Sequence, residues 1–233
     1  MLDQSVIHEI ESLPLAEAVA KFAAQFTSGE VVFSSSLGQE DQVLTDVIFK
    51  NNLPVKVFTI DTGRLFNETY ELLEKTTARY RRNIDLYFPE TSDIENFVKE
   101  KGINAFYESV ENRKSCCYLR KVVPLNRALQ GAKAWVTGLR AEQSDNRQDM
   151  PMIEWLEDRG LYKFNPLIRW SYDEMMDYIR THQVPYNRLH DQGYISIGCA
   201  PCTRAIEPGE EARAGRWWWE TSKKECGLHT AGR

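Results

Sequence analysis

The chain has 233 residues, of which 42% are hydrophobic and 27% are charged, and its formal net charge is −5. This balance is typical of a globular protein with one substantial core, and it gives no general reason to expect nucleic-acid binding. No stretch approaches the ~18 to 20 apolar residues of a membrane span, and the first residues lack the basic start and apolar core of a signal peptide. We therefore expect a cytoplasmic protein with neither nucleic-acid nor membrane partners.

Short apolar runs alternate with segments of helical periodicity along the chain. The predicted strands cover residues 31–33, 55–60, 84–88 and 134–137. The predicted helices cover residues 15–26, 41–50, 68–80, 93–101, 122–129 and 173–182. This alternation favours an α/β fold with a parallel sheet that helices cover on both faces. Ligands of such sheets bind beyond the carboxyl ends of the strands.

Three of the predicted strands run into loops that are rich in small or basic residues. The candidates for ligand binding in these loops are Ser34, Ser35, Ser36, Gly38, Asp61, Gly63, Gly138, Arg140 and Arg147. Hydroxyl groups and backbone N–H groups at a helix N-terminus can donate hydrogen bonds to an anion or a nucleotide. Ordinary capping is the simpler alternative, with Glu40 and Asp41 complementing the helix dipole after the first strand and Asp61 capping a helix after the second.

The five cysteines carry the strongest chemical signal. Cys116 and Cys117 are adjacent, Cys199 and Cys202 form a Cys-Ala-Pro-Cys pair, and Cys226 stands alone near the C-terminus. An odd number of cysteines in a cytosolic chain argues against a disulfide framework. Two pairs predict a four-thiolate site for zinc or an iron–sulfur cluster, and adjacent ligands favour the larger cluster. The remaining cysteine is a candidate nucleophile, although buried, inert cysteines are the alternative.

Taken together, these motifs resemble those of the assimilatory adenylyl-sulfate reductases, relatives of the 3′-phosphoadenylyl-sulfate reductases. The resemblance spans about residues 31–229, nearly the whole chain. The most specific part is the combination of the adjacent cysteines, the Cys-Ala-Pro-Cys pair and the Glu-Cys-Gly-Leu-His tail. The other matching segments are Ser34-Ser35-Ser36-Leu37-Gly38 with Glu40-Asp41, Asp61-Thr62-Gly63, Arg120-Lys121, Gly138-Leu139-Arg140 and Thr203-Arg204.

The resemblance implies an adenine-nucleotide α-hydrolase-like (PP-loop-related) fold with a flexible C-terminal tail. We expect a single α/β domain over residues 1–216 and a tail over residues 217–233. The resemblance also implies a 4Fe–4S cluster on Cys116, Cys117, Cys199 and Cys202, with Lys121 between cluster and substrate. The implied reaction is the reduction of adenylyl sulfate to sulfite and AMP, with thioredoxin or glutaredoxin as the reductant.

The implied reaction needs a soft nucleophile and positive charge around a sulfate group. A thiolate suits attack at sulfur, so Cys226 is expected to form an S-sulfocysteine intermediate that the partner thiol then resolves. The basic candidates for binding the anion are Lys121, Arg140, Arg147, Arg213 and Arg216, of which the last two are expected on one helix face. His229 lies three residues after Cys226 and is a further candidate, with a solvent-exposed tail histidine as the alternative.

Three other functions remain open from the sequence. The first is reduction of 3′-phosphoadenylyl sulfate, alone or together with adenylyl sulfate. The second is tRNA thiolation, which predicts a Ser-Gly-Gly loop and a basic surface that the sequence does not display. The third is a zinc-stabilised nucleotide-binding module without catalysis. The oligomeric state also stays open, a homo-oligomer included.

Overall fold

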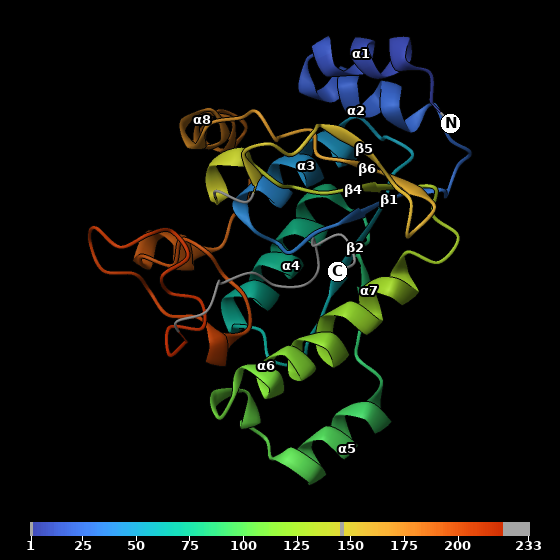
Figure 1. Ribbon diagram of the computed structural model, residues 1–233. Helices are drawn as coiled ribbons and strands as arrows, with labels where there is room; N and C mark the ends of the chain where they lie inside the picture. Colours follow the sequence, from blue (N-terminus) through green and yellow to red (C-terminus); the bar gives the residue numbers. More distant parts are fainter. Residues whose placement is uncertain (1, 145–146, 221–233) are drawn as a thin grey trace. The chain divides into compact units, whose positions relative to one another are not determined.

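The computed structural model describes residues 2–144 and 147–220 and contains one six-stranded sheet (Figure 1). The sheet order is β3-β2-β1-β4-β6-β5. The strands are β1 (Val31–Ser34), β2 (Lys56–Ile60), β3 (Asp85–Tyr87), β4 (Ala134–Val136), β5 (Ile153–Leu156) and β6 (Leu161–Phe164). The pairs β1–β2, β1–β4 and β4–β6 are parallel, whereas β5 pairs with β6 in the antiparallel direction. The predicted α/β fold and its four predicted strands are therefore confirmed.

Strands β5 and β6 were not predicted from the sequence. Each has only four residues, and charged residues interrupt the apolar pattern of both. Glu154 of β5 lies directly opposite Lys163 of β6, and their side chains form an ion pair of 2.9 Å between Oε1 and Nζ. The Lys163 side chain is only 2% exposed. The hairpin thus places opposite charges in register, which a search for apolar runs does not detect.

The central strands β1 and β4 are buried, as expected for strands covered on both faces. Phe33 of β1, Val136 of β4 and Phe164 of β6 are fully buried. The ring of Phe22, from α2 (Leu15–Ala23), packs on that of Phe164 with centroids 4.3 Å apart. The apolar runs of the sequence therefore correspond to the core that holds the carboxyl ends of β1 and β4 in place.

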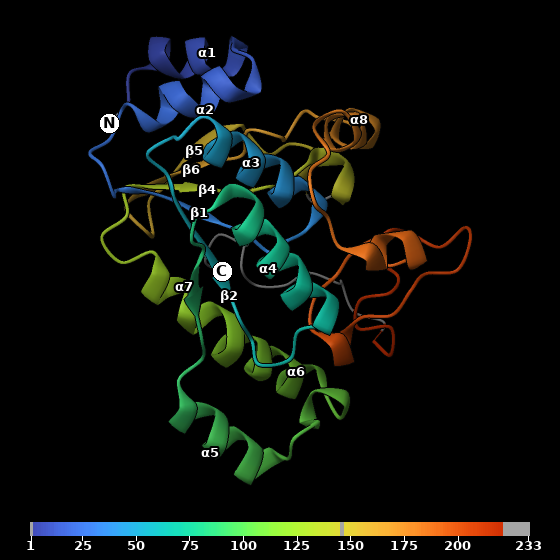
Figure 2. The same ribbon diagram turned by 180° about the vertical axis from the view of Figure 1, so that it is seen from behind.

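Four helices form a continuous layer in which each contacts the next (Figure 2). Helix α1 (Gln4–Ser12) packs on α2, α2 on α3 (Gln39–Lys50), and α3 on α8 (Tyr172–His182). Helix α8 begins with a capping box between Ser171 and Glu174. Helix α1 was not predicted, because only one of its residues, Ile10, is buried. In the described part of the chain, no helix has both the length and the apolar character needed to cross a membrane.

The other helices are α4 (Asn67–Tyr80), α5 (Thr91–Lys101), α6 (Val110–Cys117) and α7 (Val123–Ala128). A wide turn of π-helix, Tyr118–Val122, joins α6 directly to α7. In it the N–H of Val123 donates to the carbonyl oxygen of Tyr118, five residues earlier. Such turns are rare and are frequent at functional sites. This one follows the adjacent cysteines and contains Arg120 and Lys121.

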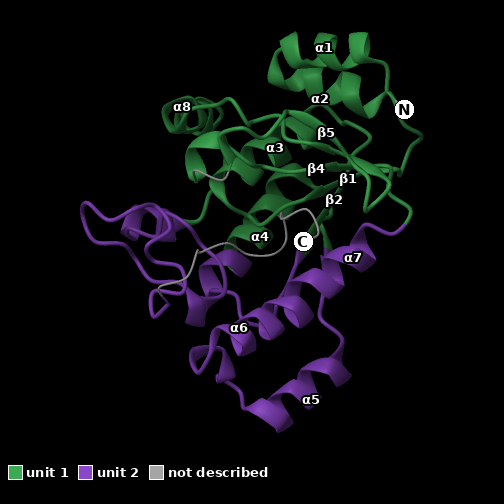
Figure 3. Ribbon diagram, in the orientation of Figure 1, with its two compact units in different colours: residues 1–59, 71–85, 131–187 green, residues 60–70, 86–130, 188–233 purple. Residues whose placement is uncertain are grey.

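The described residues divide into two compact units, shown in Figure 3. Unit 1 comprises Met1–Thr59, Glu71–Asp85 and Gly131–Asn187, and unit 2 comprises Ile60–Tyr70, Leu86–Gln130 and Arg188–Arg233. Trp217 is buried within unit 2. The predicted division between a domain over residues 1–216 and a tail over residues 217–233 stays a prediction, since residues 221–233 lie outside the described part of the chain.

The ion pair of the β5–β6 hairpin, in which Lys163 is buried and Glu154 is half-buried, gives a stability prediction. We expect Glu154→Gln to destabilise the protein by about 1 to 3 kcal/mol, because it leaves the buried ammonium of Lys163 without a charged partner. Adding Lys163→Met should recover most of the loss. The matched control is Asp177→Asn in the exposed Arg180–Asp177 pair, which should change nothing measurable. Urea unfolding checks all three variants, and equal effects in the buried and exposed pairs would contradict the prediction.

Candidate functional site

The serines at the end of β1 and in the loop after it bond within unit 1. Ser34 Oγ accepts a hydrogen bond from the indole nitrogen of Trp135 at 2.8 Å, and Ser35 Oγ accepts one from the backbone N–H of Leu37 at 3.2 Å. Leu37 itself has a φ of 60°, a left-handed conformation that is uncommon for leucine. Gly38 is the N-cap residue of α3. The loop is therefore held in a fixed and strained shape, which is common at ligand sites.

Asp41 joins the loop after β1 to the loop after β4. Its Oδ2 accepts hydrogen bonds from Ser36 N at 2.5 Å and Ser36 Oγ at 2.6 Å, and the carboxylate also accepts one from the backbone N–H of Gly138. Burial raises the pKa of Asp41 to about 6, although the bonds from Ser36 oppose that rise. Because the folded chain holds this proton more tightly than the unfolded chain, this group's contribution to stability falls as pH rises from about 4 to about 6. The sequence interpretation of Asp41 as a residue that complements the helix dipole misses this contact.

Arg140 and Arg147, also in unit 1, are both buried. Arg140 forms ion pairs with Glu40 and Glu142, each 2.9 Å between nitrogen and oxygen. Its backbone N–H donates to Gln143 Oε1 at 3.2 Å, and Arg147 Nη1 donates to the same oxygen. The structure thus brings the two arginines together, and it balances the charge of Arg140 with two carboxylates.

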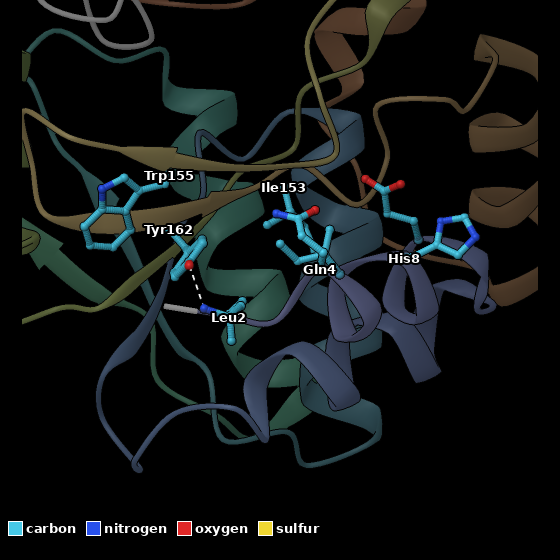
Figure 4. Close-up of a pocket in the computed structure, with 8 residues that line it drawn as sticks. Leu2, Gln4, His8, Ile153, Trp155 and Tyr162 are labelled. Carbon is cyan, nitrogen blue, oxygen red and sulfur yellow. Dashed lines mark hydrogen bonds between the residues drawn. The ribbon is translucent and has the colours of Figure 1, made fainter.

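A pocket of about 420 Å³ lies elsewhere in unit 1, between α1 and the β5–β6 hairpin (Figure 4). Trp155, Tyr162 and His8 are among the residues that line it. The hydroxyl of Tyr162 accepts a hydrogen bond from the backbone N–H of Leu2 at 2.7 Å. None of the residues predicted from the sequence to bind substrate lines this pocket.

The loop after β2 belongs to unit 2 and bonds tightly within itself. Asp61 Oδ1 accepts hydrogen bonds from Gly63 N at 2.7 Å and from the hydroxyl of Tyr70 at 3.0 Å. Burial, together with the bond to Asp61, raises the pKa of Tyr70 to about 12. Gly63 has a φ of 69°, which favours glycine, and a Cβ on it would lie 3.4 Å from Arg120 Nη1. Asp61 therefore shapes the turn that brings Gly63 beside Arg120.

The four paired cysteines lie together in unit 2. Cys199 and Cys202 are buried in a cluster with Phe106 and Trp217, and the half-buried Cys116 and Cys117 pack against it. Cys199 Sγ lies 3.2 Å from Thr62 Oγ1. The pairs, 82 residues apart in the sequence (199 − 117), thus share one cluster. Among the described residues, no group of three or more His, Cys, Asp or Glu side chains is arranged to hold a single metal ion.

Basic side chains surround the cysteine cluster. Arg120 Nη1 donates to the carbonyl oxygen of Thr62 at 2.6 Å. Burial raises the pKa of Cys116, and the Arg120 guanidinium opposes that rise. Burial and the neighbouring thiols of Cys199 and Cys117 raise the pKa of Cys202 to about 12, against the opposing charges of Lys121 and Arg216. Ionisation of these thiols is therefore unfavourable, and a positively charged group bound among them would make their ionisation easier.

Two buried nitrogen donors suggest what the cysteine cluster could hold. Within the described residues, Nε of Arg216 and Nε1 of Trp217 have no hydrogen-bond partner. Both belong to buried residues, and Trp217 packs among the cysteines. Buried donors without acceptors are costly, and thiolates or sulfides are suitable acceptors. Four cysteines with such donors beside them fit an iron–sulfur cluster in chemical terms.

Arg213 and Arg216 do not share a helix, so that expectation was wrong. Residues 212–215 form a turn, in which the N–H of Arg216 donates to the carbonyl oxygen of Arg213 at 3.0 Å, and Arg216 pairs with Thr203 in an isolated bridge. The guanidinium of Arg216 packs against Gly198, where a Cβ would lie 2.3 Å from Nη2. The sequence interpretation did not identify Gly198, although a glycine before the cysteine pair was a signal of close approach.

Arg113 is a second residue that the sequence interpretation did not identify. It lies on α6, three residues before Cys116, and it forms a buried ion pair with Glu220 at 2.9 Å. Nothing in the local sequence marks either partner, because they are 107 residues apart. Glu220 is the last described residue before the C-terminal segment, and Cys226 and His229 lie outside the described residues.

Gly138→Ala tests the contact between the two loops of unit 1. A Cβ at this position would lie 2.0 Å from Asp41 Oδ1, so Asp41 must move and lose its bonds to Ser36. We expect a loss of about 1 to 3 kcal/mol, a typical cost of overpacking, measured by urea unfolding. The control is Gly38→Ala, where the nearest atom is Ser36 Oγ at 3.3 Å and the loss should be smaller. Unchanged stability of Gly138→Ala would show that Asp41 does not hold the loops together.

Comparisons with known proteins show which family the chain belongs to. The model of the phosphoadenosine phosphosulfate reductase domain family matches residues 30–205. The chain is 52% identical over 223 residues to an adenosine 5′-phosphosulfate reductase of Allochromatium vinosum, covering 94% of this chain and 87% of the relative. It is also 52% identical over 224 residues to a protein of the same name from Sinorhizobium fredii, covering 96% of this chain and 88% of the relative.

A solved structure supports the same assignment. The crystal structure of phosphoadenylyl-sulfate reductase from Candida auris in complex with phosphate superposes with a TM-score of 0.72 and 31% identity. The match covers 88% of this chain and 98% of the Candida auris chain. The adenine-nucleotide α-hydrolase-like fold expected from the sequence is thereby confirmed. The chain belongs to the phosphoadenosine phosphosulfate reductase domain family.

Proposed function

We propose that this protein reduces adenylyl sulfate to sulfite and AMP in assimilatory sulfate reduction. The observation that carries the proposal is the gathering of four cysteines in one cluster, in a chain that is 52% identical to relatives named adenosine 5′-phosphosulfate reductase. The competing substrate is 3′-phosphoadenylyl sulfate, because the chain is also similar to the Candida auris phosphoadenylyl-sulfate reductase. The lower identity of that match, 31%, makes it the second candidate.

In this proposal Cys116, Cys117, Cys199 and Cys202 hold a 4Fe–4S cluster. When bound, the cluster would supply concentrated charge and polarisable sulfur beside the substrate. Arg120, Arg216 and Trp217 would donate hydrogen bonds toward the sulfurs and so compensate the negative charge of four thiolates. The buried nitrogen donors of Arg216 and Trp217 support this role.

Lys121 and Arg216 are the proposed ligands of the sulfate, assisted by Arg213. The charges of Lys121 and Arg216 already act on Cys202, so both lie near the cysteine cluster. Arg140 is less suited to the sulfate, because its charge is balanced by Glu40 and Glu142. We assign Arg140 and Arg147 to the shape of the nucleotide loops instead. The other proposed nucleotide contacts are Ser34, Ser35, Ser36, Gly38, Gly138, Asp61 and Gly63.

The proposed nucleophile is Cys226, with His229 supporting its thiolate. The thiolate attacks the sulfur of adenylyl sulfate, a sulfur–sulfur bond forms, and the bond from sulfur to the bridging oxygen breaks with release of AMP. A thiolate of thioredoxin or glutaredoxin then attacks Cys226 Sγ and releases sulfite, and its second thiol resolves the mixed disulfide. This assignment rests on the sequence, where Cys226 is the one cysteine outside the two pairs. A cytoplasmic location fits the reductant, and a homo-oligomer is compatible with the proposal.

Anaerobic turnover tests the proposed function directly. We expect sulfite release from adenylyl sulfate and reduced thioredoxin, with a higher kcat/KM for adenylyl sulfate than for its 3′-phosphorylated form. The reason is that a 3′-phosphate needs a further basic partner, and no candidate residue is assigned to that role. A higher kcat/KM for 3′-phosphoadenylyl sulfate would reverse the substrate assignment, and no sulfite from either substrate would refute the function.

Lys121 provides a separate test of the anion site. We expect Lys121→Ala to lower kcat/KM by roughly 100-fold, the typical effect of removing a preorganised donor to developing charge. Lys121→Arg should retain more activity than Lys121→Ala, since it keeps the charge. Lys114→Ala, which removes a lysine of α6 that carries no proposed role, is the control. Equal activity of Lys121→Ala and the control would leave Lys121 without a role in catalysis.

Cys226 is tested by trapping its intermediate. Enzyme incubated with adenylyl sulfate and no reductant should release about one AMP per chain, because the second step is blocked. Mass spectrometry should then find an added SO₃ group on the peptide that contains Cys226. Cys226→Ser should bind adenylyl sulfate yet form neither adduct nor sulfite. An adduct on any other cysteine would overturn the mechanism.

A further inference from the structure

The ion pair between Arg113 and Glu220 is buried and bidentate. Arg113 Nε lies 2.9 Å from Glu220 Oε1, and Arg113 Nη2 lies 3.0 Å from Glu220 Oε2. The two side chains are only 4% and 5% exposed. Two N–H donors on one carboxylate fix both its distance and its direction from the arginine. The pair therefore fixes where Glu220 lies relative to Arg113 of α6.

A contribution to folding stability does not by itself explain why Arg113 and Glu220 form an ion pair in a buried position. Taking two charges out of water costs several kcal/mol per ion, and an apolar pair of similar volume is often as stable. Unit 2 contains a second bidentate pair, between Arg204 and Glu210, but its side chains are 35% and 32% exposed. The Arg113–Glu220 pair therefore carries a larger desolvation cost than the Arg204–Glu210 pair. What it provides is a fixed geometry between its two side chains.

Arg113 also connects Glu220 with the cysteine cluster. Its guanidinium lies 4.6 Å from the ring centroid of Trp217 and hydrogen-bonds the thiol of Cys117. Glu220 N donates to the carbonyl oxygen of Trp217 at 2.9 Å, which closes the turn between them. One arginine thus contacts a proposed cluster ligand, a buried ring of the cysteine cluster and the last described residue of the chain.

We propose that Arg113 and Glu220 are positioning residues that fix the point from which the segment containing Cys226 leaves unit 2. The inference rests on the proposed function, because it gives Cys226 a reaction to perform. Cys226 follows Glu220 by six residues (226 − 220), which span at most about 20 Å. Without the pair, the last held residue would be Trp219, whose ring centroid lies 4.4 Å from that of Tyr107, and seven residues (226 − 219) would span about 24 Å.

A shorter tether raises the local concentration of the thiolate at the substrate. The volume within reach grows with the cube of the span, so the longer tether dilutes Cys226 by less than about 2-fold, and the loss of a fixed direction at Glu220 adds to this. We therefore expect the loss of the ion pair to slow sulfur transfer about 2-fold to 5-fold. Binding of adenylyl sulfate should not change, since neither side chain is assigned to it.

Glu220→Gln is the variant that tests this proposal, because it removes the charge and keeps the size. With saturating adenylyl sulfate and no reductant, AMP release in a single turnover should be about 2-fold to 5-fold slower than in the unmodified enzyme. The dissociation constant for adenylyl sulfate, the iron content and the rate of alkylation of Cys226 by iodoacetamide should stay unchanged. A purely structural pair would lower the melting temperature without this selective loss.

Two further variants sharpen the test. Arg113→Lys keeps the charge but loses the bidentate geometry, and it should slow AMP release in the same direction. Glu210→Gln removes the exposed bidentate pair of the same unit and should have no effect on AMP release. Unchanged AMP release in both Glu220→Gln and Arg113→Lys would overturn the proposal. Slower alkylation of Cys226 would also overturn it, since the pair would then act on the reactivity of the thiol.

A readout without substrate separates this proposal from the proposed function. Hydrogen exchange of the backbone amides of residues 217–220 should be faster in Glu220→Gln and unchanged in Glu210→Gln. If the unmodified enzyme releases no AMP, the proposed function fails, and the exchange experiment still decides whether the pair holds this part of the chain. Equal exchange rates in the unmodified enzyme and in both variants would show that the Arg113–Glu220 pair does not hold this part of the chain.

Discussion

The gathering of four thiols, two buried and two half-buried, in one cluster is the constraint on which the organisation of unit 2 depends. A thiol that must become a thiolate in such surroundings needs positive charge or hydrogen-bond donors close by, because burial and the adjoining thiols of Cys199 and Cys117 raise the pKa of Cys202 to about 12. Unit 2 supplies these groups from separate elements. The π-helical turn provides Arg120 and Lys121, and the segment after the Cys-Ala-Pro-Cys pair provides Arg216.

The arrangement of unit 1 follows from a different constraint, the strained loop after β1. Its shape depends on Asp41, a buried carboxylate that ties Ser36 to the backbone of Gly138. The same unit neutralises Arg140 with two glutamates, so this arginine shapes the loop and does not present an open cation. The contacts of Asp41 and Arg140 in unit 1 and the basic side chains around the cysteines of unit 2 involve different residues, so each set is separable by mutation.

The sequence predicted the parts of this structure that local patterns encode. Strands β1 and β4 are apolar runs in a buried sheet, and they were found, whereas β5 and β6 were missed because their stabilising pair, Glu154 with Lys163, reads as polar. The cysteine spacing predicted one site, and the structure gathers the four cysteines in one cluster. Contacts between distant residues could not be predicted, as with Arg113 and Glu220. The π-helical turn that carries Lys121, which is wider than an α-helix, was not predicted either.

The central claim is that the four gathered cysteines hold a 4Fe–4S cluster and not a zinc ion. The most direct measurement is metal and acid-labile sulfide analysis of anaerobically purified protein, combined with its visible absorption spectrum. The account predicts about four iron and four sulfide per chain, a broad absorption of thiolate-to-iron character, and its loss in Cys202→Ser. About one zinc per chain with no labile sulfide would contradict the account and favour a zinc-stabilised module.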